Sequence, residues 1–261
     1  MAFNSQKPRV RAATAIAAVA LISSSVSAQA VAELPFGPGE QLTYSVRVGK
    51  LGKVGRGTMT VEGPMVVRDV EAYALHFDVR ARVGFLTATD RTCSWIDPQR
   101  MAALRFQKHE RHPLSKYDEK VELFPQEHRW ERAAGDSGIS PTDAPLDELS
   151  FIYYVRTLPL VADTTYELTR HFESGRNPIQ LRVVRRDTLV TEAGTFPTVF
   201  VELRVKDPRH YKGDGVIGIH LSDDSHRMPV RITSSMPLFG STVLTLIAHS
   251  YAAEYEATHS R

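Results

Sequence analysis

Apolar and polar side chains alternate along much of this chain, and this alternation restricts the fold more than any other feature. Between Tyr73 and Val83 every second side chain belongs to an apolar row, and the intervening positions are mostly His, Asp and Arg. A period of two with one apolar side is typical of a β-strand that has one buried and one solvated face. The pattern recurs over 199–205, 217–221 and 230–233. Such one-sided strands predict antiparallel sheet, because parallel sheets are covered on both faces.

Short turn sequences separate the predicted strands, and glycine, aspartate or serine supplies the backbone angles that each turn needs. The four clearest are Gly49–Lys53 after a strand over 42–48, Glu192–Thr195 after 182–191, Ser222–Ser225 after 216–221, and Met236–Gly240 before 241–248.

One segment has helical periodicity instead. Thr142 or Asp143 is the expected N-cap, Pro145 lies near the first turn, and Pro159 ends the segment. A lone amphipathic helix among many strands must bury its apolar stripe against the sheet. The sequence therefore predicts a mainly β protein: a strongly curved antiparallel sheet, or incomplete β-barrel, with one helix packed on its concave face. The stripe consists of Leu146, Leu149, Ile152 and Tyr153.

The N-terminal segment has the order of a cleaved secretory signal peptide. Cations between Lys7 and Arg11 precede an apolar run over 12–22, and small residues end at Ala28. The apolar run is about half the length that a helix needs to cross a bilayer. We therefore expect cleavage after Ala28, with Ala30 as the alternative, and a soluble mature protein in the periplasm of a Gram-negative-type bacterium.

The remaining chain is expected to form a single β-rich domain over 34–251, followed by a frayed tail over 252–261. The whole chain has 32 basic and 30 acidic residues, and removal of the signal leaves 29 and 30. A near-neutral chain gives no support for nucleic-acid binding. The lone Cys93 cannot form an internal disulfide and lies too far from the cleavage site for a lipid anchor, so we expect a small buried side chain.

Two groups of residues are candidate metal ligands. Imidazoles and carboxylates at 220–226 could bind zinc or iron, but the same residues suit a hairpin turn capped by aspartate, which we favour. His109 and His112 are separated by three positions rather than the four of the helical zinc motif, and Pro113 follows at once. No metal or other cofactor is predicted. The first group consists of His220, Asp223, Asp224 and His226.

Other catalytic motifs are missing from the sequence. No serine lies in a Gly-x-Ser-x-Gly sequence. Gly52, Gly55 and Gly57 lie between strands rather than before a helix, which argues against a phosphate-binding loop. We therefore expect no enzymatic activity. Six arginines on polar faces are interpreted as a solvated surface, with a patch for anionic headgroups or sugars as the alternative. They are Arg80, Arg82, Arg182, Arg185, Arg186 and Arg204.

Four segments, taken together and after an export signal, resemble one bacterial exported-protein family. They are Phe36–Val46, Asp147–Arg156, Ala193–Phe196 and Leu221–Val230. The family is called domain of unknown function 3108, and the resemblance covers almost all of the mature chain. The charged stretch Gln107–Arg132 matches no motif.

The resemblance implies an envelope protein without an established activity, so no catalytic or binding residue is transferred from it. It also implies a fold similar to the lipoprotein-carrier group, a curved antiparallel sheet with helical material over its mouth. Within the matching segments, we expect Arg227 to pair with Asp223 or Asp224. Arg156 is expected to complement the negative end of the helix dipole.

Two functions from different classes follow. The first is a non-enzymatic protein that binds a lipid or another apolar ligand inside a half-open barrel, with the helix as plug or lid. The second is an envelope scaffold or assembly factor that binds a protein or polysaccharide through its polar sheet face or an exposed edge. The predicted lining residues of the first are Phe77, Val79, Val201, Leu203, Ile217 and Ile219, with Leu149 and Tyr153 of the helix.

Overall fold

The computed structural model describes Met1 and residues 33–206, 214–236 and 240–252. The predicted signal peptide, apart from Met1, and the tail beyond Ala252 lie outside these residues. The unit that begins at Glu33 contains all the helices and strands described below.

Within the described residues, fourteen strands form one sheet in which every neighbouring pair is antiparallel, as predicted. The order across the sheet is β8-β7-β6-β5-β4-β3-β2-β1-β14-β13-β12-β11-β10-β9, so almost every connection is a hairpin. The strands are β1 Gln41–Val48, β2 Gly52–Val67, β3 Val70–Val83, β4 Leu86–Asp97, β5 Ala102–His112, β6 Ser115–Phe124, β7 Arg129–Arg132, β8 Ser137–Ile139, β9 Thr165–Leu168, β10 Ile179–Thr191, β11 Gly194–Lys206, β12 Asp214–Ser222, β13 Pro229–Met236 and β14 Gly240–Ser250.

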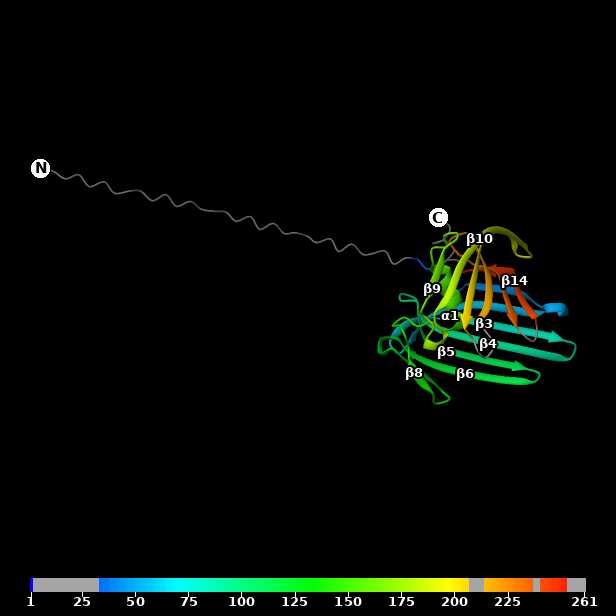
Figure 1. Cartoon of the computed structure of the whole chain (residues 1–261), viewed down its shortest axis with the longest axis horizontal. Coiled ribbons are helices and arrows are strands. Elements are labelled where there is room, and N and C mark those ends of the chain that lie inside the picture. Colours follow the sequence, from blue (N-terminus) through cyan, green and yellow to red (C-terminus); the bar gives the residue numbers. More distant parts are fainter. Residues whose placement is uncertain (2–32, 207–213, 237–239, 253–261) are drawn as a thin grey trace. The chain divides into compact units, whose positions relative to one another are not determined.

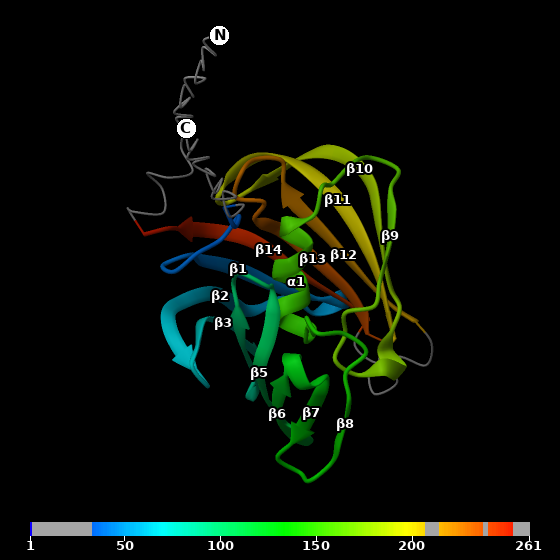
Figure 2. The same cartoon turned by 90° about the vertical axis from the view of Figure 1, so that its left-hand side faces the viewer.

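The sheet curves strongly but does not close, because β8 and β9 are its two edges. The single α-helix of the described residues, α1 (Glu148–Thr157), stands within the curve, and Figure 2 shows strands on both sides of it. This is the predicted architecture. We call the face that packs against α1 the inner face and the opposite one the outer face.

The alternation in sequence sorts side chains between these two faces. On β3, Leu75 is buried, while its neighbour His76 belongs to the outer face. On the other side of the sheet, Val201 of β11 lies directly opposite Ile219 of β12, and both are fully buried. One continuous apolar core therefore joins the two halves of the sheet through α1.

The start of α1 differs from the prediction. The N-cap is Asp147, not Thr142 or Asp143, and its carboxylate accepts hydrogen bonds from the backbone of Leu149 and Ser150, both at 2.9 Å. Ser150 completes a capping box by accepting a hydrogen bond from the Asp147 backbone N–H. The helix begins later because the chain before Asp147 is extended: Leu146 forms an isolated bridge with His171.

Candidate functional site

The predicted lining residues lie in one core, but they differ in exposure. Val201, Leu203, Ile219, Leu149 and Tyr153 are at most 3% exposed, and all five belong to the apolar core that includes α1. Phe77, Val79 and Ile217 are only partly buried at the edge of the same core. The first five side chains are therefore packed in the core and do not line an open cavity.

The three partly buried residues lie on the inner face at different positions along the strands. Phe77 and Val79 follow the buried Leu75 in β3, and Ile217 precedes the buried Ile219 near the start of β12. The strand register aligns Phe77 with Leu42 and Ile217 with Val48, near opposite ends of β1. Partly exposed apolar side chains thus remain on the inner face outside its fully buried part.

The inner face of β4–β6 is charged instead. Lys108 of β5 donates to Glu148 at 2.7 Å and lies 3.2 Å from Glu110, and Arg176 binds the other oxygen of Glu148 at 2.9 Å. The chain of ion pairs continues through Glu173 and Arg132 to Glu119. We call these seven side chains the ionic chain: Glu110, Lys108, Glu148, Arg176, Glu173, Arg132 and Glu119.

Its members stabilise one another's charged forms. Burial alone would raise the pKa of Glu148, but Lys108 and Arg176 outweigh burial and hold that pKa far below its usual range. Burial opposes the charge of Arg132, yet Glu173 and Glu119 raise its pKa above the usual value. The inner face is therefore divided into an apolar part and an ionic part.

A separate ion pair, which the sequence did not predict, lies in the apolar core. Arg156 and Glu40 are both fully buried, and the guanidinium binds the two carboxylate oxygens at 2.7 and 2.6 Å. It also donates to the backbone oxygens of Pro35 and His226, each at 2.8 Å. Burial opposes the arginine's charge, but Glu40 outweighs burial and raises the pKa of Arg156. Arg156 thus does more than complement the helix dipole: it joins three of the four segments that resemble the family.

The outer face carries a hollow. It has a volume of about 610 Å³ and opens over β2–β5. Trp95, His76 and Gln107 are half-buried in it, and exposed arginines border it. Cys93 also lies here, and burial raises the pKa of its thiol far above the usual range, which makes the thiol a poor nucleophile. Of the predicted inner lining residues, Val79 is the one that borders this hollow.

Among the described residues, no three histidine, cysteine, aspartate or glutamate side chains lie close enough together to hold a metal ion. Asp224 caps the turn by accepting from the backbone of His226 and Arg227, as favoured from the sequence. His109 and His112 lie on opposite faces of β5, where they face Asp118 and Asp90.

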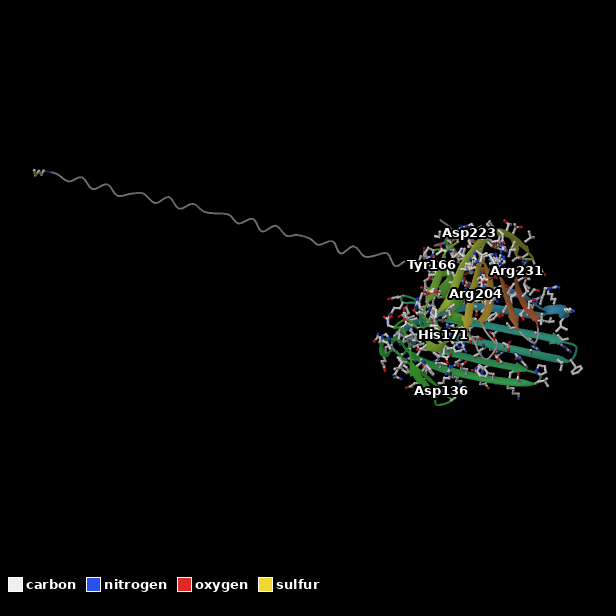
Figure 3. All side chains as sticks on the ribbon, viewed as in Figure 1. Asp136, Tyr166, His171, Arg204, Asp223 and Arg231 are labelled. Atoms are coloured by element: carbon white, nitrogen blue, oxygen red, sulfur yellow. The ribbon has the colours of Figure 1, made fainter. Side chains whose placement is uncertain are left out.

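The predicted ion pair between Arg227 and Asp223 or Asp224 is wrong. Its guanidinium donates to the backbone oxygen of Leu158, and Asp223 binds Arg186 at 2.9 Å instead. Arg204 also has an acidic neighbour, Glu202 at 3.1 Å, and Figure 3 shows Arg204 and Asp223 apart from each other. Arg185 likewise binds Asp187. Among the described residues, no carboxylate pairs with the remaining three predicted arginines, which are Arg80, Arg82 and Arg182.

Similar folds occur in solved structures of low sequence identity. A β-barrel-like protein of domain of unknown function DUF1849 from Brucella abortus has a TM-score of 0.53 at 9% identity, over 82% of this chain and 98% of that one. An exported protein with a YmcC-like fold from Bacteroides fragilis has a TM-score of 0.35 at 12% identity, over 83% and 98%. A lipoprotein from Parabacteroides distasonis has a TM-score of 0.33 at 9% identity, over 83% and 97%. The first comparison supports the curved β architecture and carries no functional assignment.

Sequence comparison gives a family but no activity. No curated protein matches the chain. Within the described residues, no helix has the length and apolar character needed to span a membrane. The family model described as "Protein of unknown function (DUF3108)" matches residues 43–247, which include α1 and almost the whole sheet. The chain therefore belongs to the DUF3108 family.

Proposed function

We propose that this protein is an exported, non-enzymatic binding protein of the bacterial cell envelope that holds an apolar or lipid-like ligand on its inner face. The observation that carries the proposal is the apolar surface that α1 leaves uncovered. Phe77, Val79 and Ile217 remain partly exposed there, although they belong to the same apolar core as the residues beneath the helix. An apolar chain on this surface would remove it from water without displacing buried side chains.

The ionic chain favours a ligand that also has a polar part. Lys108 and Glu110 are inner-face residues of β5, and β4 alone separates this strand from β3, which carries Phe77 and Val79. A lipid-like molecule could place its apolar portion on β3 while its polar portion lies near β5. Buried apolar area would supply most of the affinity, and the polar contacts would set its orientation.

Ligand-induced thermal stabilisation tests this proposal. Delipidated protein is heated with a fatty acid, a phospholipid or a lipopeptide, and we expect at least one to raise the unfolding temperature. The variant Phe77→Gln should lose most of this increase. The matched control is Val66→Gln, because Val66 is 72% exposed and lies next to the C-terminal end of β2, away from Met59, the β2 residue that pairs with Phe77. No increase with any of the three ligands, or an equal increase for wild type and Phe77→Gln, would contradict the proposal.

The hollow of the outer face favours a second candidate, in which the protein is a scaffold that binds an envelope polysaccharide. Trp95 offers an aromatic surface for a sugar ring, while His76 and Gln107 offer polar contacts beside it. The variants Trp95→Ala and Gln107→Ala should then lose binding in a polysaccharide pull-down while Phe77→Gln keeps it. Equal retention of all three variants would exclude the hollow as the binding surface.

A further inference from the structure

Three neighbouring hairpin turns each present a large apolar side chain to solvent. Leu51 between β1 and β2 is 58% exposed, Phe85 between β3 and β4 is 88% exposed, and Leu114 between β5 and β6 is fully exposed. These hairpins are consecutive in the sheet, and Figure 1 shows their turns along one end of the domain. Since each hairpin adds two strands, adjacent turns lie about 10 Å apart. We call this end the apolar edge.

The apolar edge is rich in cations and poor in acids. The seven-residue windows centred on Leu51, Phe85 and Leu114 contain no aspartate or glutamate. They contain five cations: Lys50, Lys53, Arg82, Arg111 and Lys116. Two of these have acidic neighbours, because Lys53 lies 3.5 Å from Glu192 and Arg111 binds Asp118 at 2.7 Å. Among the described residues, no carboxylate pairs with the other three.

A row of cations crosses the outer face behind this edge. Arg56 of β2 lies directly opposite Arg80 of β3, and Arg111 of β5 lies directly opposite Lys116 of β6. Thr89 of β4 stands between the two pairs in the same row. Like charges in directly opposed positions destabilise a sheet unless an anion compensates them. Asp118 already compensates Arg111, but among the described residues no carboxylate pairs with Arg56, Arg80 or Lys116. These three cations therefore favour an anionic partner beside the apolar edge.

We propose that the apolar edge docks the protein on an anionic phospholipid bilayer. The three exposed side chains would enter the outer part of the acyl region, and the cations at and behind the turns would lie among the phosphate groups. Such burial of separate apolar side chains, combined with attraction to anionic lipid, is how peripheral proteins bind a bilayer without spanning it. A protein groove is the less suitable partner, because the three side chains stand on separate turns and form no continuous surface.

Vesicle co-sedimentation of the full mature domain tests the proposal. We expect binding to vesicles that contain phosphatidylglycerol, weaker binding to phosphatidylcholine vesicles, and loss of binding as salt is increased. The triple variant Leu51→Ser, Phe85→Ser, Leu114→Ser should bind at least about tenfold more weakly, because each side chain no longer transfers apolar area from water. The triple variant Lys50→Gln, Arg82→Gln, Lys116→Gln should lose about fivefold for each cation. Val66→Ser is the control, since this exposed side chain lies at the other end of β2.

Folding and insertion are checked separately. The three apolar side chains are exposed, so their replacement should leave the unfolding temperature unchanged. In a Leu114→Trp variant, brominated lipid should quench the additional fluorescence. No binding of the wild-type domain to anionic vesicles, or equal binding of wild type and the apolar triple variant, would overturn the proposal. The proposal does not depend on a ligand of the inner face, because Phe77→Gln should dock as wild type does.

Discussion

Removing one partner of the buried ion pair between Glu40 and Arg156 should destabilise the fold strongly. The substitution Arg156→Met keeps much of the aliphatic volume but removes two contacts with the carboxylate and two with the backbone oxygens of Pro35 and His226. It leaves a carboxylate that is fully buried and has no cation beside it. Loss of one member of a buried pair typically costs about 3–5 kcal/mol. We therefore expect the free energy of unfolding to fall by about 4 kcal/mol.

The double variant Glu40→Leu, Arg156→Met separates the charge effect from simple loss of contacts. It removes both charges, so the remaining cost is that of two buried carbonyls without a donor, about 1 kcal/mol each. The double variant should therefore be more stable than either single variant. Urea unfolding at neutral pH measures this as midpoint shifts at constant slope. Additive losses in the double variant, or a loss below about 1 kcal/mol for Arg156→Met, would refute the reasoning.

Three further predictions concern local features of the fold. Burial raises the pKa of Asp147 to about 6 despite the hydrogen bonds from Ser94 and Ser150. Since this is above the unfolded value, the contribution of Asp147 to stability should decrease as pH rises from about 4 to 6. In urea unfolding, the stability of the wild type relative to Asp147→Asn should therefore fall over this range, and a constant difference would contradict the prediction. Cys93 should react with a thiol reagent at pH 8 far more slowly in the native protein than in urea, and equal rates would contradict its protected state. Gly55→Ala should lower the unfolding temperature, because the new Cβ would lie 2.0 Å from the backbone oxygen of Arg80. Gly52→Ala is the comparison: its new Cβ would have no neighbour within 4 Å, so any loss of stability there comes from the positive φ of Gly52 alone.

The architecture could be predicted because an antiparallel strand with one solvated face has a local alternation of apolar and polar residues in its sequence. In β3 and β11 the apolar rows are local in sequence, so period, turns and face could be recognised without knowledge of the partners. The predicted N-cap, Thr142 or Asp143, was wrong, and Asp147 caps the helix instead. The signal that identifies it, an acceptor at Asp147 followed three residues later by Ser150, was present in the sequence.

The polar interior could not be predicted in the same way. On β5, Lys108 and Glu110 point inward while Gln107 and His109 point outward, so polar residues occupy both faces and the alternation carries no information. The pair of Glu40 and Arg156 joins residues 116 positions apart, and neither residue has a local pattern that indicates its partner. Side-chain chemistry identifies such contacts only once the fold has brought the segments together.

The anchoring of α1 bears on whether the helix acts as a plug or a lid. At its start, Ser94 of β4 donates to Asp147 at 2.5 Å, and at its end Arg156 binds Glu40, which precedes β1. Both contacts are buried, so outward movement of the helix would break them and leave polar groups without partners. Displacement would also expose the apolar residues beneath it. These costs favour a fixed plug, and a ligand of the inner face would then meet only the uncovered residues, Phe77, Val79 and Ile217.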